Sequence, residues 1–214
     1  MTSSLFFGII HYCMDLSKII IITGHYGAGK TNTAINLAMT LRNDNPSANI
    51  TVADLDIVNP YFRTADFAKL FGEYNIKLAV SDYANSSLDI PAVRLNVKGE
   101  VANCDYLIID VGGDDEGAKA LGRFSREVQD IGYEMYYVIN RYRLQTRTAE
   151  QAVTLMRDIE KASKLKCTAI VDNSNLGSES IIENAEYADE VSRLTGLQII
   201  LIKKEIYVKK VWEV

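Results

Sequence analysis

Residues 18–42 read KIIIITGHYGAGKTNTAINLAMTLR, and this stretch decides the fold. Its first part, residues 18–23, contains four consecutive isoleucines, which is typical of a strand buried on both faces of a parallel sheet. Its last part, residues 30–42, carries apolar residues at helical spacing. A short glycine-rich segment connects the two parts. The stretch therefore predicts a strand, a tight loop and a helix, in that order, as the first unit of an α/β fold.

The glycine-rich segment matches the pattern G-x-x-x-x-G-K-[ST]. In such a loop the backbone N–H groups and the positive end of the following helix surround a phosphate group. Lys30 would neutralise the β- and γ-phosphate oxygens, and Thr31 would offer its hydroxyl to Mg²⁺. We therefore predict ATP and Mg²⁺ as ligands. The predicted nucleotide-binding residues of this segment are Gly24, His25, Tyr26, Gly27, Ala28, Gly29, Lys30, Thr31 and Asn32.

The rest of the chain repeats the alternation of short apolar runs and amphipathic stretches. The predicted strands are residues 18–23, 49–53, 77–81, 106–111, 134–139, 168–172 and 198–203. The predicted helices are residues 30–42, 64–71, 117–130, 146–163 and 179–195. Parallel strands need such crossover helices between them. We therefore predict an α/β fold with three layers, a doubly wound and mostly parallel seven-stranded sheet, of the P-loop NTPase type.

Two further segments place carboxylates after predicted strands. In TVADLDIVNPYF, residues 51–62, a strand is expected to end at Ala53, and Asp54 and Asp56 follow it two residues apart. In YLIIDVGGDDEG, residues 106–117, an apolar strand leads to Asp110, predicted to hold Mg²⁺ through a water. The glycine pair after it would let the N–H of Gly113 approach the γ-phosphate. The predicted metal-binding residues are Thr31, Asp56 and Asp110.

With these motifs in this order, the chain resembles the MinD/ParA-type branch of P-loop ATPases, which also contains CobQ/CobB-like domains, over roughly residues 17 to 205. The resemblance implies that Asp54 orients the attacking water, with Lys30 as the other catalytic residue, and that Asp56 supports the first switch. The position of the signature lysine of the family holds His25 in this chain, and Tyr26 stands where a glycine is usual. The resemblance also implies a possible nucleotide-dependent homodimer and an unknown client protein as partners.

The sequence leaves alternatives for the residues that recognise the base and for the roles of the segments beside the site. By resemblance Asn173 reads adenine, with Asn175 or the pair Asn140 and Arg141 as alternatives. Phosphate motifs do not specify the base, so GTP is possible, although the chain has no N-K-x-D segment. Arg63 is either a phosphate-contacting arginine or a salt-bridge residue. Residues 82–103 form either a surface insertion near the site or a plain connector.

The motifs favour an ATP hydrolase that acts as a conformational switch. A small-molecule kinase or an ATP-dependent ligase of the dethiobiotin-synthetase kind is an alternative, with an acceptor at residues 82–103. A regulatory module that holds nucleotide with little hydrolysis is another, because the signature lysine is replaced. The motifs do not indicate the pathway, since one scaffold serves many clients.

Composition excludes several other classes. The 214 residues carry a formal net charge of −5, which removes the electrostatic reason for a nucleic-acid partner. Three widely spaced cysteines predict reduced thiols of a cytoplasmic protein and no metal cluster. The apolar run at residues 5–12 is too short to span a membrane, and no membrane partner is expected. We interpret residues 1–16 as an N-terminal extension, with Met14 as a possible start, and residues 17–214 as one P-loop nucleotide-binding domain.

Overall fold

The computed structural model describes residues 16–55, 67–79, 95–113, 115–175 and 185–202. The strands are β1 (Ile19–Gly24), β2 (Ile50–Leu55), β3 (Lys77–Ala79), β4 (Tyr106–Val111), β5 (Tyr133–Ile139), β6 (Ala169–Asp172) and β7 (Gln198–Ile200). The helices are α1 (Lys30–Asp44), α2 (Ala68–Glu73), α3 (Val97–Ala102), α4 (Asp115–Gly122), α5 (Ser125–Ile131), α6 (Ala149–Ser163) and α7 (Ala185–Thr195), with a short 3-10 helix η2 (Leu144–Thr146).

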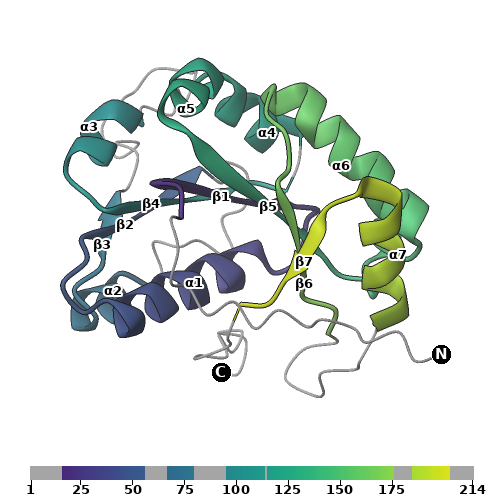
Figure 1. Ribbon diagram of the computed structural model, residues 1–214, viewed down its shortest axis with the longest axis horizontal. Helices are drawn as coiled ribbons and strands as arrows, with labels where there is room; N and C mark the ends of the chain where they lie inside the picture. Colours follow the sequence, from purple (N-terminus) through teal and green to yellow (C-terminus); the bar gives the residue numbers. More distant parts are fainter. Residues whose placement is uncertain (1–15, 56–66, 80–94, 114, 176–184, 203–214) are drawn as a thin grey trace, which may run out of the picture.

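The strands form one seven-stranded sheet in the order β3-β2-β4-β1-β5-β6-β7 (Figure 1). Every neighbouring pair is parallel. The predicted α/β fold with a parallel seven-stranded sheet is therefore confirmed. In a parallel sheet the carboxyl ends of all strands lie along the same edge, so the described segments that follow β1, β4, β5 and β6 gather there.

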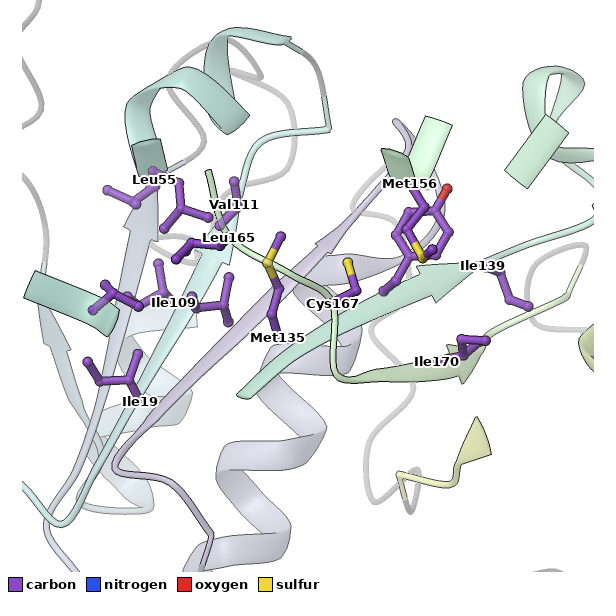
Figure 2. Close-up of a cluster of buried hydrophobic side chains, with 14 of the residues drawn as sticks. Ile19, Leu55, Ile109, Val111, Met135, Ile139, Met156, Leu165, Cys167 and Ile170 are labelled. Carbon is purple, nitrogen blue, oxygen red and sulfur yellow. The ribbon is translucent and has the colours of Figure 1, made fainter. Parts of the chain in front are cut away.

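Helices cover both faces of the sheet (Figure 1). On one face α1 and α2 pack against a core that includes Ile20 and Ile22 of β1. On the other face α3, α4, α5 and α6 cover a second core that includes Ile19 and Ile21, and α7 contributes Val191 to this core. Figure 2 shows part of this core, with Ile19 labelled. Successive residues of a strand point to opposite faces, so an unbroken apolar run supplies both cores.

The predicted helix over residues 117–130 is wrong in one respect, because it is two helices, α4 and α5. The break follows Gly122, where a Cβ atom would lie 2.8 Å from the carbonyl oxygen of Ala162 on α6. The hydroxyl of Ser125 donates to the carbonyl of Gly122 at 2.9 Å and so satisfies the end of α4. A close helix contact and a hydroxyl together end the helix at this point.

Helix α3 lies in the region for which the sequence predicted an insertion or a connector. Its first turn is capped by Asn96, whose side-chain oxygen accepts a hydrogen bond from the backbone N–H of Gly99 at 3.0 Å. Strand β2 also runs further than predicted, to Leu55, so that Asp54 lies within the strand. The remaining predicted elements occur, with ends that differ by a few residues or that lie outside the described residues.

The described cysteines, Cys104 and Cys167, are buried and free. Burial raises the pKa of the Cys167 thiol, which therefore stays protonated near neutral pH. Among the residues that the structure describes, no three His, Cys, Asp or Glu side chains gather as a metal cluster. Within the same part of the chain, none of the helices combines the length and the apolar character needed to cross a membrane.

Candidate functional site

The candidate site lies at the carboxyl edge of the sheet, around the loop between β1 and α1. Strand β1 lies between β4 and β5, so this loop emerges from the middle of the sheet. Its backbone turns through left-handed conformations at Gly27, with φ of 73°, and at Gly29, with φ of 96°. Side chains with a Cβ atom rarely adopt such angles, which explains the glycines of the motif. The N–H of Ala28 donates to the carbonyl of His25 at 3.0 Å and closes the turn.

Helix α1 begins immediately after this loop, with Gly29 at its N-cap. No acidic residue lies in its first turn, so the positive end of the helix is not neutralised by its own side chains. Asn32, one of the predicted nucleotide-binding residues, uses its side-chain oxygen to accept a hydrogen bond from Asn36 at 2.9 Å. The loop and the helix end therefore present N–H groups and positive potential to one place, which suits an anion.

Lys30 is buried beneath the loop, and its Nζ donates to the carbonyl of His25 at 3.3 Å. Gly113, after β4, lies against it: a Cβ atom at this position would be 2.6 Å from the Nζ of Lys30 and 2.6 Å from the backbone nitrogen of Tyr26. Only a residue without a side chain fits there. The structure thus brings the predicted residue Gly113 to the phosphate loop, although the two segments are far apart in the sequence.

Thr31 and Asp110 meet in the structure. The hydroxyl of Thr31 donates to Oδ2 of Asp110 at 2.7 Å, and the two residues are separated by 79 positions in the sequence. Asp54 on β2 is the register partner of Asp110 on β4. Asp54 comes two residues after Val52, and Asp110 comes two residues after Ile108, so each aspartate points to the same face of the sheet as that apolar residue. Val52 and Ile108 belong to the core under α1, so both carboxylates lie on the α1 face of the sheet.

The chemistry of this donor set suits Mg²⁺. A hydroxyl and carboxylates are hard oxygen ligands, and neighbouring strands lie only about 4.8 Å apart. Mg²⁺ in nucleotide sites takes few protein ligands and completes its shell with phosphate oxygens and waters. A pair such as Thr31 and Asp110 is therefore sufficient, without a cluster of carboxylates. The predicted ligand Asp56 lies outside the described residues, as do Arg63 and residues 82–94.

His25 and Tyr26, the residues that depart from the family pattern, lie at the rim of the loop. Tyr26 is 60% exposed. His25 is partly buried. Its burial and the neighbouring Lys30 ammonium lower the pKa of the imidazole below its ordinary value of 6.5. His25 is therefore neutral at pH 7 when no anion lies in the loop.

We expect an NMR titration of the ligand-free protein to give His25 a pKa below 6.5. The chain has only His11 as a second histidine, so a His11→Gln variant assigns the signal. Because the unfolded chain takes up this proton at higher pH than the folded one, the contribution of His25 to stability is present above pH 6.5 and is lost as the pH falls through the lowered pKa. A His25→Gln variant should lose less free energy of unfolding than the wild type on acidification. A measured pKa of 6.5 or higher for His25 in the ligand-free protein would contradict the predicted lowering of its pKa.

Asn173, predicted to read the base, lies against the phosphate loop. It follows β6 and is buried, and its Nδ2 donates to the carbonyl of Ala28 at 2.8 Å. Its Oδ1 accepts from Nδ2 of Asn175 at 3.1 Å. Its part in base recognition stays a prediction, but the structure gives it a contact that the sequence did not indicate.

Arg143 is the residue near the loop that the sequence analysis missed. It lies in the segment after β5, and its Nε donates to the carbonyl of Gly27 at 2.7 Å. The predicted alternatives Asn140 and Arg141 belong to the same segment, where the Asn140 side chain bonds the carbonyl of Asn175 at 3.3 Å. Arg141 instead lies over the ring of Tyr187, 5.9 Å from its centroid. No local pattern could have indicated Arg143, because its partner lies 116 residues away.

Comparisons with known proteins agree with this fold. A scan against protein-family models and a search among curated proteins both give no match. Among solved structures, the chain is similar to a nucleotide-binding protein in complex with ADP from Archaeoglobus fulgidus, with 16% identity, a TM-score of 0.51 and coverage of 87% of this chain and 82% of that one. It is also similar to FtsY from Mycoplasma mycoides, with 15% identity, a TM-score of 0.57 and coverage of 89% of this chain and 62% of that one.

A third similar structure is the signal recognition particle 54 kDa protein from Aeropyrum pernix K1 in complex with GDP, with 17% identity, a TM-score of 0.55 and coverage of 87% of this chain. The chain spans 42% of the length of that protein. At such identities the similarity concerns the fold alone. The parallel sheet, the loop from Gly24 to Thr31 and these neighbours define the fold as that of the P-loop NTPases.

Proposed function

We propose that this protein binds Mg·ATP and hydrolyses it, and that it uses the reaction as a conformational switch. The observation that carries the proposal is the hydrogen bond of 2.7 Å between Thr31 and Asp110. It joins the helix that follows the glycine-rich loop to the strand that carries the second acidic motif. This is the arrangement that a metal–nucleotide complex requires, since the metal must contact both the protein and the phosphates.

In this proposal the amides of the loop and the ammonium of Lys30 bind the β- and γ-phosphates. Thr31 and Asp110 would hold Mg²⁺, whose charge neutralises phosphate oxygens when it is bound. Asp54, the register partner of Asp110, is suited to orient the attacking water. Gly113 packs on Lys30 and Tyr26, so a change of its backbone on loss of the γ-phosphate would pass to the segment that leads into α4. Catalysis would rest on positioning and electrostatics.

Two features support ATP as the nucleotide. The sequence lacks an N-K-x-D segment, and the Archaeoglobus fulgidus neighbour is described in complex with ADP. The other two neighbours include a protein in complex with GDP, so the base needs a direct test. Competition of ATP and GTP for a fluorescent nucleotide provides it. The mass of the protein in solution with and without Mg·ATP tests the nucleotide-dependent homodimer.

We expect single-turnover phosphate release by an Asp54→Ala variant to be about a hundredfold slower than by the wild type. The reason is that Asp54 is the carboxylate that lies beside Asp110 on the neighbouring strand, where it would orient the attacking water. Asp158→Ala is the matched control, because Asp158 is exposed on α6, and it should leave the rate unchanged. Equal rates for Asp54→Ala and the wild type would remove Asp54 from the mechanism.

The same measurement separates hydrolysis from nucleotide holding. The replacement of the signature lysine by His25 favours a second function, a regulatory module that retains nucleotide. Such a module would bind Mg·ATP tightly and release phosphate at a rate that Asp54→Ala does not change. A small-molecule kinase would instead show turnover that depends on an added acceptor.

A further inference from the structure

Two consecutive carbonyl groups of the phosphate loop are held by side chains from distant segments. The carbonyl of Gly27 accepts a hydrogen bond from Nε of Arg143, and the carbonyl of Ala28 accepts one from Nδ2 of Asn173. The distances are 2.7 Å and 2.8 Å. Arg143 follows β5 and Asn173 follows β6, so the loop is hydrogen-bonded to the segments that follow two other strands of the sheet.

Holding a carbonyl fixes the orientation of a whole peptide group. The group is planar and trans, so its C=O and N–H point in opposite directions. The carbonyl of Gly27 shares its peptide with the N–H of Ala28, which closes the turn onto His25 at 3.0 Å. Arg143 therefore anchors the outer side of this turn while the N–H lies on the inner side.

The loop needs such an anchor because of its own composition. Gly27 is exposed and has φ of 73°, and it has no side chain with which to pack. Glycine loses more conformational freedom on ordering than any other residue. In an isolated loop, a peptide between such residues would sample several orientations, and ordering it on binding would weaken the affinity for phosphate.

The segment that carries Arg143 is itself fixed. The hydroxyl of Thr146 donates to the carbonyl of Asn140 at 2.7 Å, and the backbone N–H of Arg143 donates to the same carbonyl at 3.1 Å. Oδ1 of Asn140 accepts from the N–H of Tyr142 at 3.0 Å. The turn is tied to the end of β5, so the guanidinium is presented from a rigid base.

We infer that Arg143 is a positioning residue of the phosphate site. It acts through the peptide between Gly27 and Ala28, and it orders the loop before a phosphate arrives. The inference rests on the proposed nucleotide binding and adds a residue outside the glycine-rich motif. It predicts that Arg143 acts on the phosphate part of the ligand, irrespective of the base.

The test is calorimetric binding of two probes, Mg·ATP and magnesium tripolyphosphate, which has no base or ribose. We expect Arg143→Met to weaken both by the same factor, about tenfold, as loss of one charged hydrogen bond implies. Arg143→Lys should fail to restore the affinity, because a lysine keeps the charge but has no Nε in the position that meets Gly27. Arg147→Met, an exposed arginine of the same segment, is the control and should bind both probes normally.

Each other outcome contradicts the inference. Normal affinity of Arg143→Met for tripolyphosphate would show that the loop needs no anchor, and full rescue by Arg143→Lys would show that only charge matters. Amide hydrogen exchange without ligand keeps this inference distinct from the proposed function. Arg143→Met should speed exchange of the Ala28 N–H about tenfold, whether or not nucleotide binds. A wild type that binds neither probe would refute the proposed function, and unchanged exchange would refute the anchor.

Discussion

Replacing Lys30 with alanine should reduce the rate of ATP hydrolysis about a thousandfold and weaken Mg·ATP binding. The Nζ of Lys30 is the cation inside the loop, buried between the carbonyl of His25 and Gly113. A preorganised positive charge in a poorly solvated site is worth far more than the same charge in water. Single-turnover phosphate release and calorimetry with Mg·ATP measure the two losses.

The control for Lys30→Ala is Lys69→Ala. Lys69 is exposed on α2, on the same face of the sheet as α1, so its removal changes the net charge equally without touching the loop. We expect this control to bind and hydrolyse ATP as the wild type does. If Lys30→Ala and the wild type gave the same heat of binding, the glycine-rich loop could not be the phosphate site, and the proposed function would be wrong.

The sheet was predictable because its strands are unbroken apolar runs. The side chains of Ile19–Ile22 alternate between the two cores. Strand β1 can therefore be recognised from the sequence without deciding which of its faces is buried. The break between α4 and α5 was not predictable, since Gly122 is explained only by its contact with Ala162 on α6. Helix α3 has a local signal in its cap, Asn96, but the helix is short and its apolar pattern is weak. Tertiary contacts decide such elements.

The candidate site likewise has parts that the sequence predicted and parts that it did not. A contiguous motif predicted the loop around Lys30, and an apolar run ending in an acid predicted Asp110. Their meeting followed from the fold, because parallel strands end at one edge. The contacts of Arg143 and Asn173 with the loop carbonyls could not be predicted, since backbone carbonyls are acceptors in every sequence and leave no mark in the residue pattern. Positioning contacts of this kind can be recognised only from the structure.

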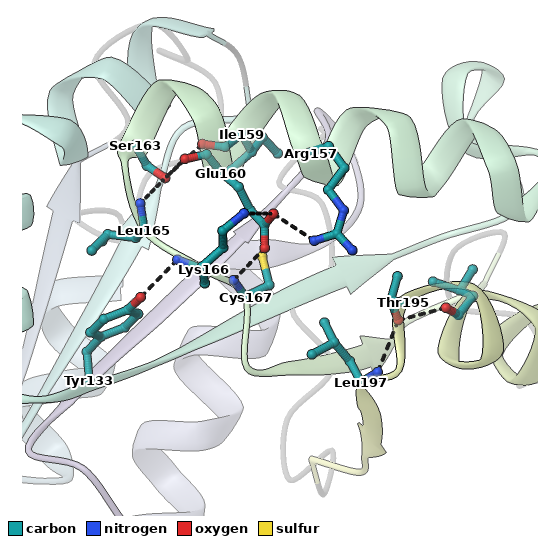
Figure 3. A network of polar contacts seen from close by, with 11 residues as sticks. Tyr133, Arg157, Ile159, Glu160, Ser163, Leu165, Lys166, Cys167, Thr195 and Leu197 are labelled. Carbon is teal, nitrogen blue, oxygen red and sulfur yellow. Dashed lines mark hydrogen bonds and ion pairs between the residues drawn. The ribbon is translucent and has the colours of Figure 1, made fainter.

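The polar contact with the largest expected effect on stability lies away from the site, at the end of α6 (Figure 3). The side chain of Glu160 is only 2% exposed. Oε2 accepts hydrogen bonds from Arg157 at 2.8 Å and Lys166 at 2.9 Å, and Oε1 accepts from the backbone N–H of Cys167 at 3.0 Å. This carboxylate fixes the turn that leads from α6 into β6, the strand that precedes Asn173.

Glu160→Ala should lower the free energy of unfolding by about 3 kcal/mol. The substitution leaves the buried N–H of Cys167 without its acceptor, whereas the two exposed cations return to water. Glu160→Gln should cost less, because an amide oxygen can still accept from Cys167. Urea denaturation measures both, with Glu190→Ala as the control: Glu190 also pairs with an arginine three residues away, but both side chains are exposed.

The effect of Glu160 should depend on pH in a defined direction. Burial raises the pKa of this carboxyl, but the hydrogen bonds from Arg157, Lys166 and Cys167 outweigh it and hold the pKa below its ordinary value of 4.5. The stabilisation is therefore fully present above pH 4.5 and is lost as the pH falls through the lowered pKa. The difference in unfolding free energy between the wild type and Glu160→Gln should shrink over this range. A difference that stayed constant would mean that Glu160 contributes through packing and not through its charge.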